Sequence, residues 1–212
     1  RGINATFKLK EYLRIQTFAS YRTLDATTGI DSLGKTYLRT RVEDGFHRTS
    51  SEISHKDAMQ EKTTGANITY SPLRIPLVLQ LNGVFTLWSL PKPVGVGYKQ
   101  PEWSGNELKN YSLSFQYPLK NIRMVGELAY SGFKQFSIIQ SAAASLSKKL
   151  DVSYLFRHYS AGYFSPKSNG LSENSENLNE IGLFLGLGYQ MNRRMKLSSY
   201  FDYFRFPGPK YQ

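Results

Sequence analysis

Three histidines are the only side chains of this chain suited to act as a general base near neutral pH, and cysteine is absent. His47 and His55 are too loosely spaced for a pair of metal ligands, and a carboxylate such as Glu52 is common near histidine in polar segments. His158 lies close to Ser160, the pairing that a serine nucleophile and its base would use. We nevertheless assign structural or solvent-exposed roles to all three, and we predict no catalytic site, no metal and no cofactor.

The segment around the first two histidines carries the signature of a helix start. Thr49 is followed three residues later by Glu52, the capping-box spacing in which each side chain bonds the other residue's backbone N–H. We therefore predict a short helix inside a long polar segment, 27–64. Arg48 is expected to form an ion pair with Glu52 at the start of that helix rather than part of an active site.

Alternation of apolar and polar residues is the main structural signal. In the stretch 110–130, NYSLSFQYPLKNIRMVGELAY, every second residue from Tyr111 to Tyr117 is apolar, and the pattern resumes after a turn at 118–121. A period of two predicts a hairpin of half-buried strands. We expect ten such strands, over residues 3–9, 13–26, 66–71, 73–85, 110–117, 122–131, 136–146, 150–159, 181–191 and 195–206.

The connections between these strands differ in length in a regular way. Long segments, 27–64, 86–107 and 161–179, and one brief link near 132–135 alternate with tight turns, and antiparallel neighbours place the tight turns together at one end of the sheet. Short turns at one end and long loops at the other are typical of outer-membrane barrels, whereas a soluble β-sandwich has no reason to separate its loops in this way. We therefore predict an all-β fold, an antiparallel up-and-down transmembrane β-barrel or a large part of one.

The two faces of the predicted strands differ in composition, which assigns a role to each. In such barrels a lipid-facing band about 25 Å tall is edged by aromatic girdles, and the other face lines the interior. The residues predicted to face lipid are Leu113, Phe115, Leu183 and Leu185. The predicted aromatic girdle consists of Tyr70, Tyr111, Tyr117, Tyr130, Tyr154 and Tyr189. The predicted lumen-facing polar residues are Arg14, Arg22, Arg74, Arg123, Glu127, Arg157, Lys196 and Asp202.

Composition bears on the partners. The chain has 15 Tyr, 13 Phe and a net charge of +11. A tyrosine side chain is apolar along its ring and polar at its hydroxyl, which suits the boundary between an apolar phase and water. No apolar run of the chain is long enough for a membrane-spanning helix. The positive charge is compatible with anionic lipid, with nucleic acid, or with a soluble basic surface. We expect outer-membrane lipid and lipopolysaccharide as partners, together with other envelope proteins in a larger complex, and nucleic acid stays open as an alternative.

Two motifs resemble large outer-membrane barrels of Bacteroidota. DGFHRTSSEISHKDAMQEKTTGANITY, residues 44–70, is similar to the first long loop of those proteins, and YFDYFRFPGPKYQ, residues 200–212, is similar to one of their strand endings. Gly208 stands where that family usually has tryptophan. The matching residues are Gly45, His47, Arg48, Thr49, Glu52 and Ile53 in the first motif, and Tyr200, Phe201, Asp202, Phe204, Phe206 and Pro207 in the second.

The resemblance implies a location in the outer membrane of a Gram-negative bacterium. Members often carry a helix-hairpin-helix, competence-like domain that these 212 residues lack, so a DNA-handling role does not carry over with it. We expect residues 1–212 to be one barrel region of a longer chain, with a pore, transport or envelope-assembly role and no catalysis. The alternatives are a DNA-uptake barrel with a basic lumen and a soluble β-sandwich that acts as a binding module.

Overall fold

The fold is seen in a computed structural model that describes residues 1–95, 103–132, 135–173 and 177–208. Strands dominate these residues, and no helix among them is long and apolar enough to cross a membrane. The elements are β1 (Gly2–Lys10), β2 (Leu13–Leu24), β3 (Ala26–Ile30), β4 (Thr36–Arg41), α1 (Ser50–Ser54), β5 (Met59–Tyr70), β6 (Val78–Lys92), β7 (Gly105–Leu119), β8 (Ile122–Ser131), β9 (Gln135–Ser147), β10 (Leu150–Tyr159), β11 (Glu180–Gln190) and β12 (Lys196–Arg205).

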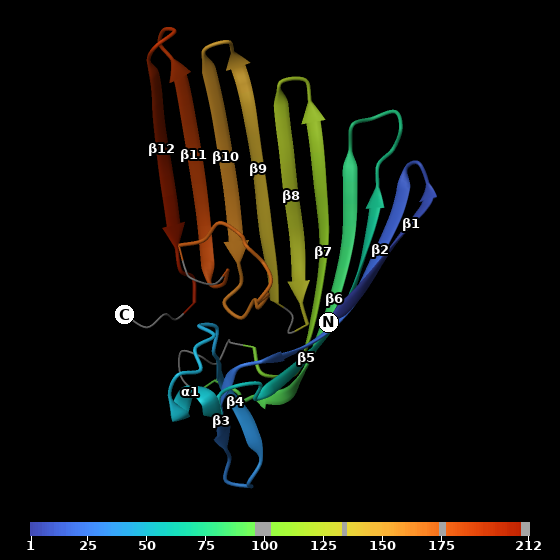
Figure 1. Ribbon diagram of the computed structural model, residues 1–212. Coiled ribbons are helices and arrows are strands. Elements are labelled where there is room, and N and C mark those ends of the chain that lie inside the picture. The colour runs from blue at the N-terminus through green and yellow to red at the C-terminus, as the bar shows by residue number, and fades with distance from the viewer. Residues whose placement is uncertain (96–102, 133–134, 174–176, 209–212) are drawn as a thin grey trace.

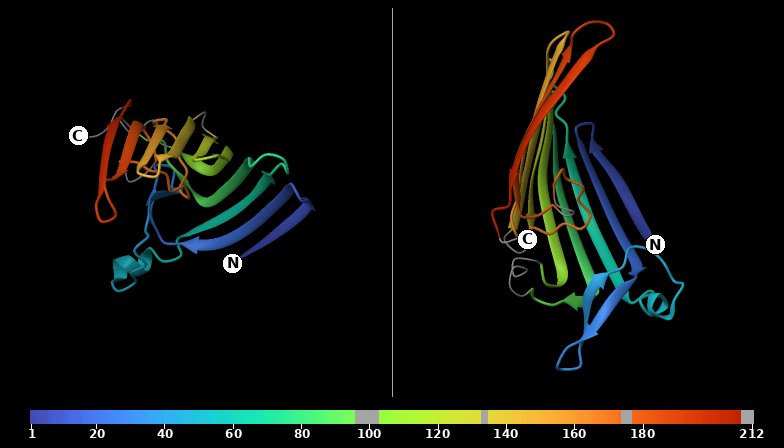
Figure 2. Two further views of the ribbon diagram at one scale, coloured as in Figure 1. Left: turned by 90° about the horizontal axis from the view of Figure 1, so that it is seen from above. Right: turned by 90° about the vertical axis from the view of Figure 1, so that its left-hand side faces the viewer.

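Ten of the strands form one antiparallel sheet in the order β1-β2-β5-β6-β7-β8-β9-β10-β11-β12 (Figure 1). Each strand pairs with its neighbour along the chain, except that the hairpin β3–β4 is set aside as a separate sheet. The sheet bends into a trough, which is clearest when it is seen from above (Figure 2). Within the described residues β1 and β12 each pair on one side only, so the predicted antiparallel sheet is present but it is not closed into a barrel.

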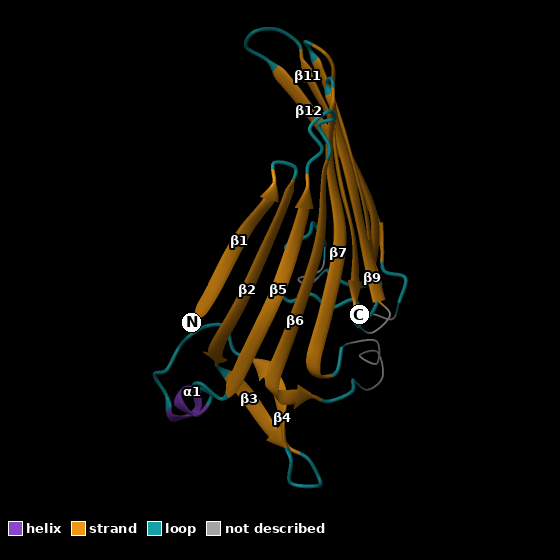
Figure 3. Cartoon of the chain, turned by 90° about the vertical axis from the view of Figure 1, so that its right-hand side faces the viewer, coloured by secondary structure: helices purple, strands orange, loops and turns teal. Residues whose placement is uncertain are grey.

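The two ends of the sheet differ as the sequence predicted. The connections β1–β2, β5–β6, β7–β8, β9–β10 and β11–β12 lie together at the top of Figure 1, and we call this the turn end; the longest of them is 71–77, between β5 and β6. One further short connection, between β8 and β9, joins strands at the other end. The hairpin β3–β4, helix α1 and the connection between β10 and β11 lie at the opposite, loop end (Figure 3).

Several predicted strand bounds need correction. The segment 27–64 holds the hairpin β3–β4 as well as the expected helix, and β5 begins at Met59 rather than at residue 66. β6 begins at Val78 and continues through Pro91 into the segment predicted to be a loop. Proline is tolerated there because the pairing with β7 is irregular between Leu87 and Lys92, and a bulge does not need the missing N–H.

The two faces of the sheet carry different side chains, because directly paired residues point to the same side. On one side Asn67, Asn82 and Ser112 form a row joined by side-chain hydrogen bonds of 2.6 and 3.0 Å, and we call this the polar face. The next residue of each strand points to the other side, which we call the apolar face. It carries a row of five apolar residues, of which four are exposed. Its members are Ile68, Leu81, Leu113, Leu128 and Ile138.

The apolar core lies at the loop end rather than within the sheet. Met59, Trp88 and Leu108, from β5, β6 and β7, are buried together with Trp103, and the hairpin β3–β4 covers them with Ala26 and Leu38. The ten-stranded sheet therefore has no described layer packed along its apolar face, and its compact part is the assembly of loops at one end.

Shortening Met59 to alanine tests whether this cluster stabilises the chain. Met59 is 0% exposed, so Met59→Ala removes buried contacts and should lower the free energy of unfolding by about 2–5 kcal/mol. The two tryptophans of the chain both belong to the cluster, so tryptophan fluorescence during urea unfolding reports on it directly. Met195→Ala, at a turn-end residue that is 55% exposed, is the matched control and should change little.

Candidate functional site

The connection between β10 and β11, described over residues 160–173 and 177–179, folds back over the polar face and reaches β5. Its Lys167 donates hydrogen bonds from Nζ to Glu61 Oε1 at 3.1 Å and to Thr63 Oγ1 at 2.8 Å. Lys167 and Glu61 are 106 residues apart in the sequence, and five steps of strand order separate β5 from β10. The connection, which we call the crossing loop, thus joins two distant parts of the sheet.

Glu61 is the centre of the contacts on the β5 side. Its carboxylate is 1% exposed and accepts hydrogen bonds from Arg22 Nε at 2.9 Å, from Trp88 Nε1 at 2.9 Å and from Lys167. An ionised carboxylate withdrawn from water is stable only when such partners replace its hydration. The Glu61 cluster therefore needs both the sheet, which supplies Arg22 and Trp88, and the crossing loop, which supplies Lys167.

A second charged cluster holds the two ends of the crossing loop. The fully buried Arg157 of β10 donates to Glu180 of β11 at 2.5 Å and, through two nitrogens, to Asp202 of β12 at 3.0 and 3.3 Å. The remaining oxygen of Glu180 accepts from Ser172 Oγ at 3.2 Å and from the Glu173 backbone N–H at 2.9 Å. The ion pairs that join three strands also fix the loop.

Aromatic contacts connect the crossing loop to the apolar core. The ring of Phe164 is stacked on Trp103, with centroids 5.2 Å apart and planes 10° from parallel, and Trp103 in turn contacts Trp88 at 4.9 Å. Trp88 also donates to Glu61, so the apolar cluster and the charged cluster share one side chain.

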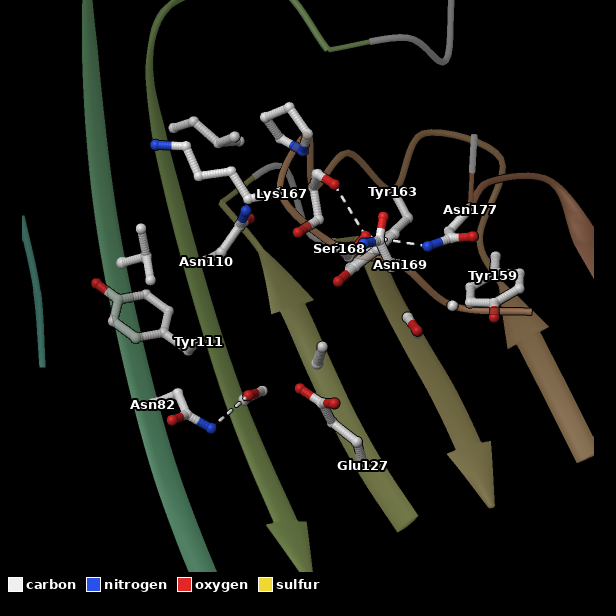
Figure 4. A pocket seen from close by; sticks show the side chains of 18 of the residues that line it. Asn82, Asn110, Tyr111, Glu127, Tyr159, Tyr163, Lys167, Ser168, Asn169 and Asn177 are labelled. Atoms are coloured by element: carbon white, nitrogen blue, oxygen red, sulfur yellow. Dashed lines mark hydrogen bonds between the residues drawn. The ribbon is translucent and has the colours of Figure 1, made fainter. Parts of the chain in front are cut away.

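Between the crossing loop and the polar face lies a cavity of about 480 Å³ (Figure 4). Its floor is formed by polar-face residues of β6 to β9, including Asn82, Ser112 and Glu127, and its roof by residues 163–170 of the loop. The volume falls within the range of about 300–1,000 Å³ that is usual for small-molecule sites.

Seven of the eight predicted lumen-facing residues lie on the polar face, and Arg74 does not. It lies in the connection 71–77, because β6 begins five residues later than predicted. Arg22 and Arg157 have carboxylate partners, and Asp202 is one of those partners. The register places the seven on one side of the sheet: Arg14, Arg22, Arg123, Glu127, Arg157, Lys196 and Asp202.

The sequence patterns predicted Arg22, Arg157 and Asp202 but not their partners Glu61, Glu180 and Lys167. Glu61 fell inside the segment predicted to be a long loop, and Glu180 lay one residue before the predicted start of its strand. Lys167 belonged to a loop with no periodic pattern. Once the start of β5 is known, the alternation of side chains along the strand places Glu61 on the polar face.

The residues predicted to face lipid share the apolar face of the sheet: Leu113, Phe115, Leu183 and Leu185. The girdle tyrosines lie on this face too, at three levels. At the turn end lie Tyr70, Tyr117 and Tyr189. Nearer the loop end Tyr111 is paired with Tyr130. Tyr154 was expected near a strand end but lies mid-strand, paired with Ala142 and Leu185.

The first sequence motif forms a structured turn and helix at the loop end. Thr49 caps α1 and Glu52 completes the capping box, as predicted, and Arg48 pairs with Glu52 at 3.2 Å. The hydrogen bonds from Arg48 hold the pKa of Glu52 below its usual value. Gly45 adopts a left-handed backbone conformation, φ 65°, which glycine adopts without strain.

Two of the histidines have clear structural contacts. His47 Nε2 lies 2.6 Å from Asp25 Oδ2, and His158 contacts the ring of Phe136 edge-on on the apolar face. Across the described residues no group of three or more histidine or acidic side chains could hold a metal ion.

Comparison with known proteins yields no relative. No protein-family model, no curated protein and no solved structure matches this chain. The contacts and the two faces of the sheet are therefore the basis for any functional conclusion.

The glycine beneath Arg157 gives a direct test of the second charged cluster. A Cβ at residue 182 would lie 2.5 Å from the guanidinium carbon of Arg157, whereas a Cβ at Gly188 would meet nothing closer than 3.4 Å. Gly182→Ala should therefore displace the guanidinium, lower the free energy of unfolding by about 3–5 kcal/mol, and expose the crossing loop to proteases. Equal effects from Gly182→Ala and its control Gly188→Ala would contradict this role.

Asp25 makes the loop end sensitive to acid. Hydrogen bonds from the Asp57 backbone N–H, at 3.0 Å, and from His47 lower the pKa of Asp25 from its ordinary value of 3.8. The ionised carboxylate therefore stabilises the fold fully when the pH is above the ordinary pKa of 3.8, and this stabilisation is lost as the pH falls through the lowered pKa. The protection of residues 42–58 against hydrogen exchange, taken relative to the intrinsic exchange rate at each pH, should fall below about pH 4.

Two substitutions distinguish the effect of protonating Asp25 from the effect of protonating other acidic groups. Asp25→Asn should accelerate exchange of residues 42–58 already at neutral pH and weaken its dependence on acid. Glu43→Gln is the control, because Glu43 is largely exposed and its ion pair within the described residues is with Arg41 at 3.4 Å. An unchanged acid profile in Asp25→Asn would show that another group controls the opening.

Proposed function

We propose that this chain forms the wall of a β-barrel in the outer membrane of a Gram-negative bacterium, with a role in solute transport or envelope assembly. The observation that carries the proposal is the contrast between the two faces of the sheet. Leucine, isoleucine, phenylalanine and tyrosine side chains are exposed along the apolar face, while charged and amide side chains occupy the other.

The apolar face extends across the whole sheet, as a lipid-contacting surface must, and polar residues such as Lys62 and Lys109 appear on it towards the loop end. It runs from Phe7 on β1 to Phe201 on β12, both of which are more than half exposed. Monomeric soluble proteins rarely expose continuous apolar patches beyond a few hundred Å². Lipid tails satisfy such a surface without any further protein layer.

A soluble sandwich is the weaker alternative because the second layer is missing. A sandwich packs two sheets face to face about 10 Å apart. In the described part of the chain the only other sheet is the hairpin β3–β4, and it packs on β6 at the loop end. The polar face cannot serve as the inner side of a sandwich either, since it carries the ion pairs of Arg22 and Arg157.

The free edges of the sheet set a condition on how such a wall is completed. Unpaired N–H and C=O groups cost several kcal/mol each in the hydrocarbon region, so β1 and β12 must be paired there. The two edge strands run in opposite directions across the sheet. Direct pairing between them, or an even number of added strands, gives a barrel in which all neighbours are antiparallel.

Transport of small polar solutes fits the polar face better than passage of DNA. Two of its arginines, Arg22 and Arg157, are already neutralised by carboxylates, which leaves fewer cations for a phosphate backbone. The crossing loop also covers part of the face, and an obstruction of this kind favours small solutes over polymers.

Arginine substitutions on the two faces of the sheet test the membrane assignment. Leu113→Arg and Leu185→Arg place a charge on the apolar face, which near the middle of a bilayer costs about 2–4 kcal/mol. Ser114→Arg is the matched control, because Ser114 points to the polar face and bonds to Gln80. The two leucine variants should assemble poorly in lipid vesicles while Ser114→Arg assembles as the unmodified chain does.

Assembly is measured by heat-modifiable mobility in electrophoresis, alongside solubility without detergent. A folded, detergent-dependent species whose mobility shifts on heating is the expected result. A monomer that stays soluble without detergent, or equal assembly of all three variants, would overturn the proposal.

A further inference from the structure

The cavity beneath the crossing loop is a chemical environment distinct from the rest of the polar face. It is closed from above by Tyr163, Lys167 and Asn169, and bounded below by the floor strands (Figure 4). The roof is held in place by contacts outside the cavity, above all the Phe164–Trp103 stack and the bonds to Glu180. A space with a fixed roof and floor can select a ligand by shape.

The lining combines apolar side chains, such as Phe18, Val84 and Ile139, with neutral groups that both donate and accept hydrogen bonds. Asparagine amides come from the floor, at Asn82 and Asn110, and from the loop, at Asn169 and Asn177. Serine and tyrosine hydroxyls lie between them. A ligand that matches such a lining must itself offer donors and acceptors around its surface, as a polyhydroxylated molecule does.

The charges in the lining restrict the ligand further. Glu127 makes no ion pair within the described part of the chain, and its carboxylate repels anions. Lys167, which would attract an anion, is already bonded to Glu61 and Thr63. A small ammonium would pair with Glu127 but has no acceptor for the amide donors around it.

We propose that this cavity binds a neutral, polyhydroxylated solute of sugar size, with the carboxylate of Glu127 accepting hydrogen bonds from its hydroxyl groups. The inference goes beyond the membrane assignment, because the cavity belongs to the folded chain whatever covers the apolar face. Hydrogen bonds to a charged acceptor are stronger than those to a neutral one, so Glu127 supplies a large share of the affinity.

Calorimetric titration of the purified folded chain tests the proposal. The neutral probes are glucose, galactose, N-acetylglucosamine and maltose, and the charged probes are choline and inorganic phosphate. At least one neutral sugar should bind while choline and phosphate do not. Glu127→Gln, which keeps the shape and removes the charge, should weaken that binding about tenfold.

Two further variants separate the cavity from general effects on the fold. Asn169→Ala alters the exposed roof without touching a strand and should also weaken binding. Glu107→Gln is the matched control, since Glu107 lies near Lys109 at 3.9 Å and does not line the cavity. Unchanged tryptophan emission in each variant shows that the loop end is still folded.

Other outcomes overturn the inference. These are binding of choline or phosphate alone, no binding of any neutral probe, or sugar binding that both cavity variants leave intact. The membrane proposal fails by different readouts, namely mobility on heating and assembly of the arginine variants, so the failure of one is distinguishable from the failure of the other.

Discussion

The structure depends on how a single bent sheet stabilises two chemically different faces when the described residues provide no second layer along it. An apolar core between layers normally supplies most of the stability of a domain. In this sheet the exposed apolar side chains lie on one face, and the other face carries amides, hydroxyls and charges along most of its length. Met59, Trp88 and Leu108 lie on that polar face, at the loop end only. Stability in water must then come from the loop end, where Met59, Trp88 and Leu108 are buried, and the remaining apolar surface requires an external partner.

The buried charges are costly in isolation and are stable only as clusters. Removing Glu61 or Arg157 from water costs several kcal/mol, and each is offset by three or more hydrogen bonds in fixed directions. Such clusters contribute less to net stability than to specificity, because few alternative arrangements satisfy all partners at once. Both clusters are completed by the crossing loop, so the loop has one favoured position on the polar face.

The sequence predicts the middle of the sheet well and its loop end poorly, for a physical reason. Between Tyr111 and Tyr130 one face is apolar and the other polar, so the period of two is visible and the hairpin was predicted correctly. At the start of β5, MQEKTT, both faces carry polar residues, and no alternation marks the strand. The hairpin β3–β4 was missed because its strands are short and only one residue in each is fully apolar and buried against the core, Ala26 and Leu38.

The site was harder to predict than the fold because its contacts span the chain. The Lys167–Glu61 pair joins residues 106 positions apart, and no local pattern marks either partner. The Lys167–Glu61 pair also links two parts of the sheet that are distant in strand order. In a flat sheet β5 and β10 would lie five strand spacings apart, about 24 Å, and the crossing loop connects them across the polar face. Lys167 both lines the cavity and bonds to Glu61, so the cavity and the link between the two parts of the sheet depend on the same side chain.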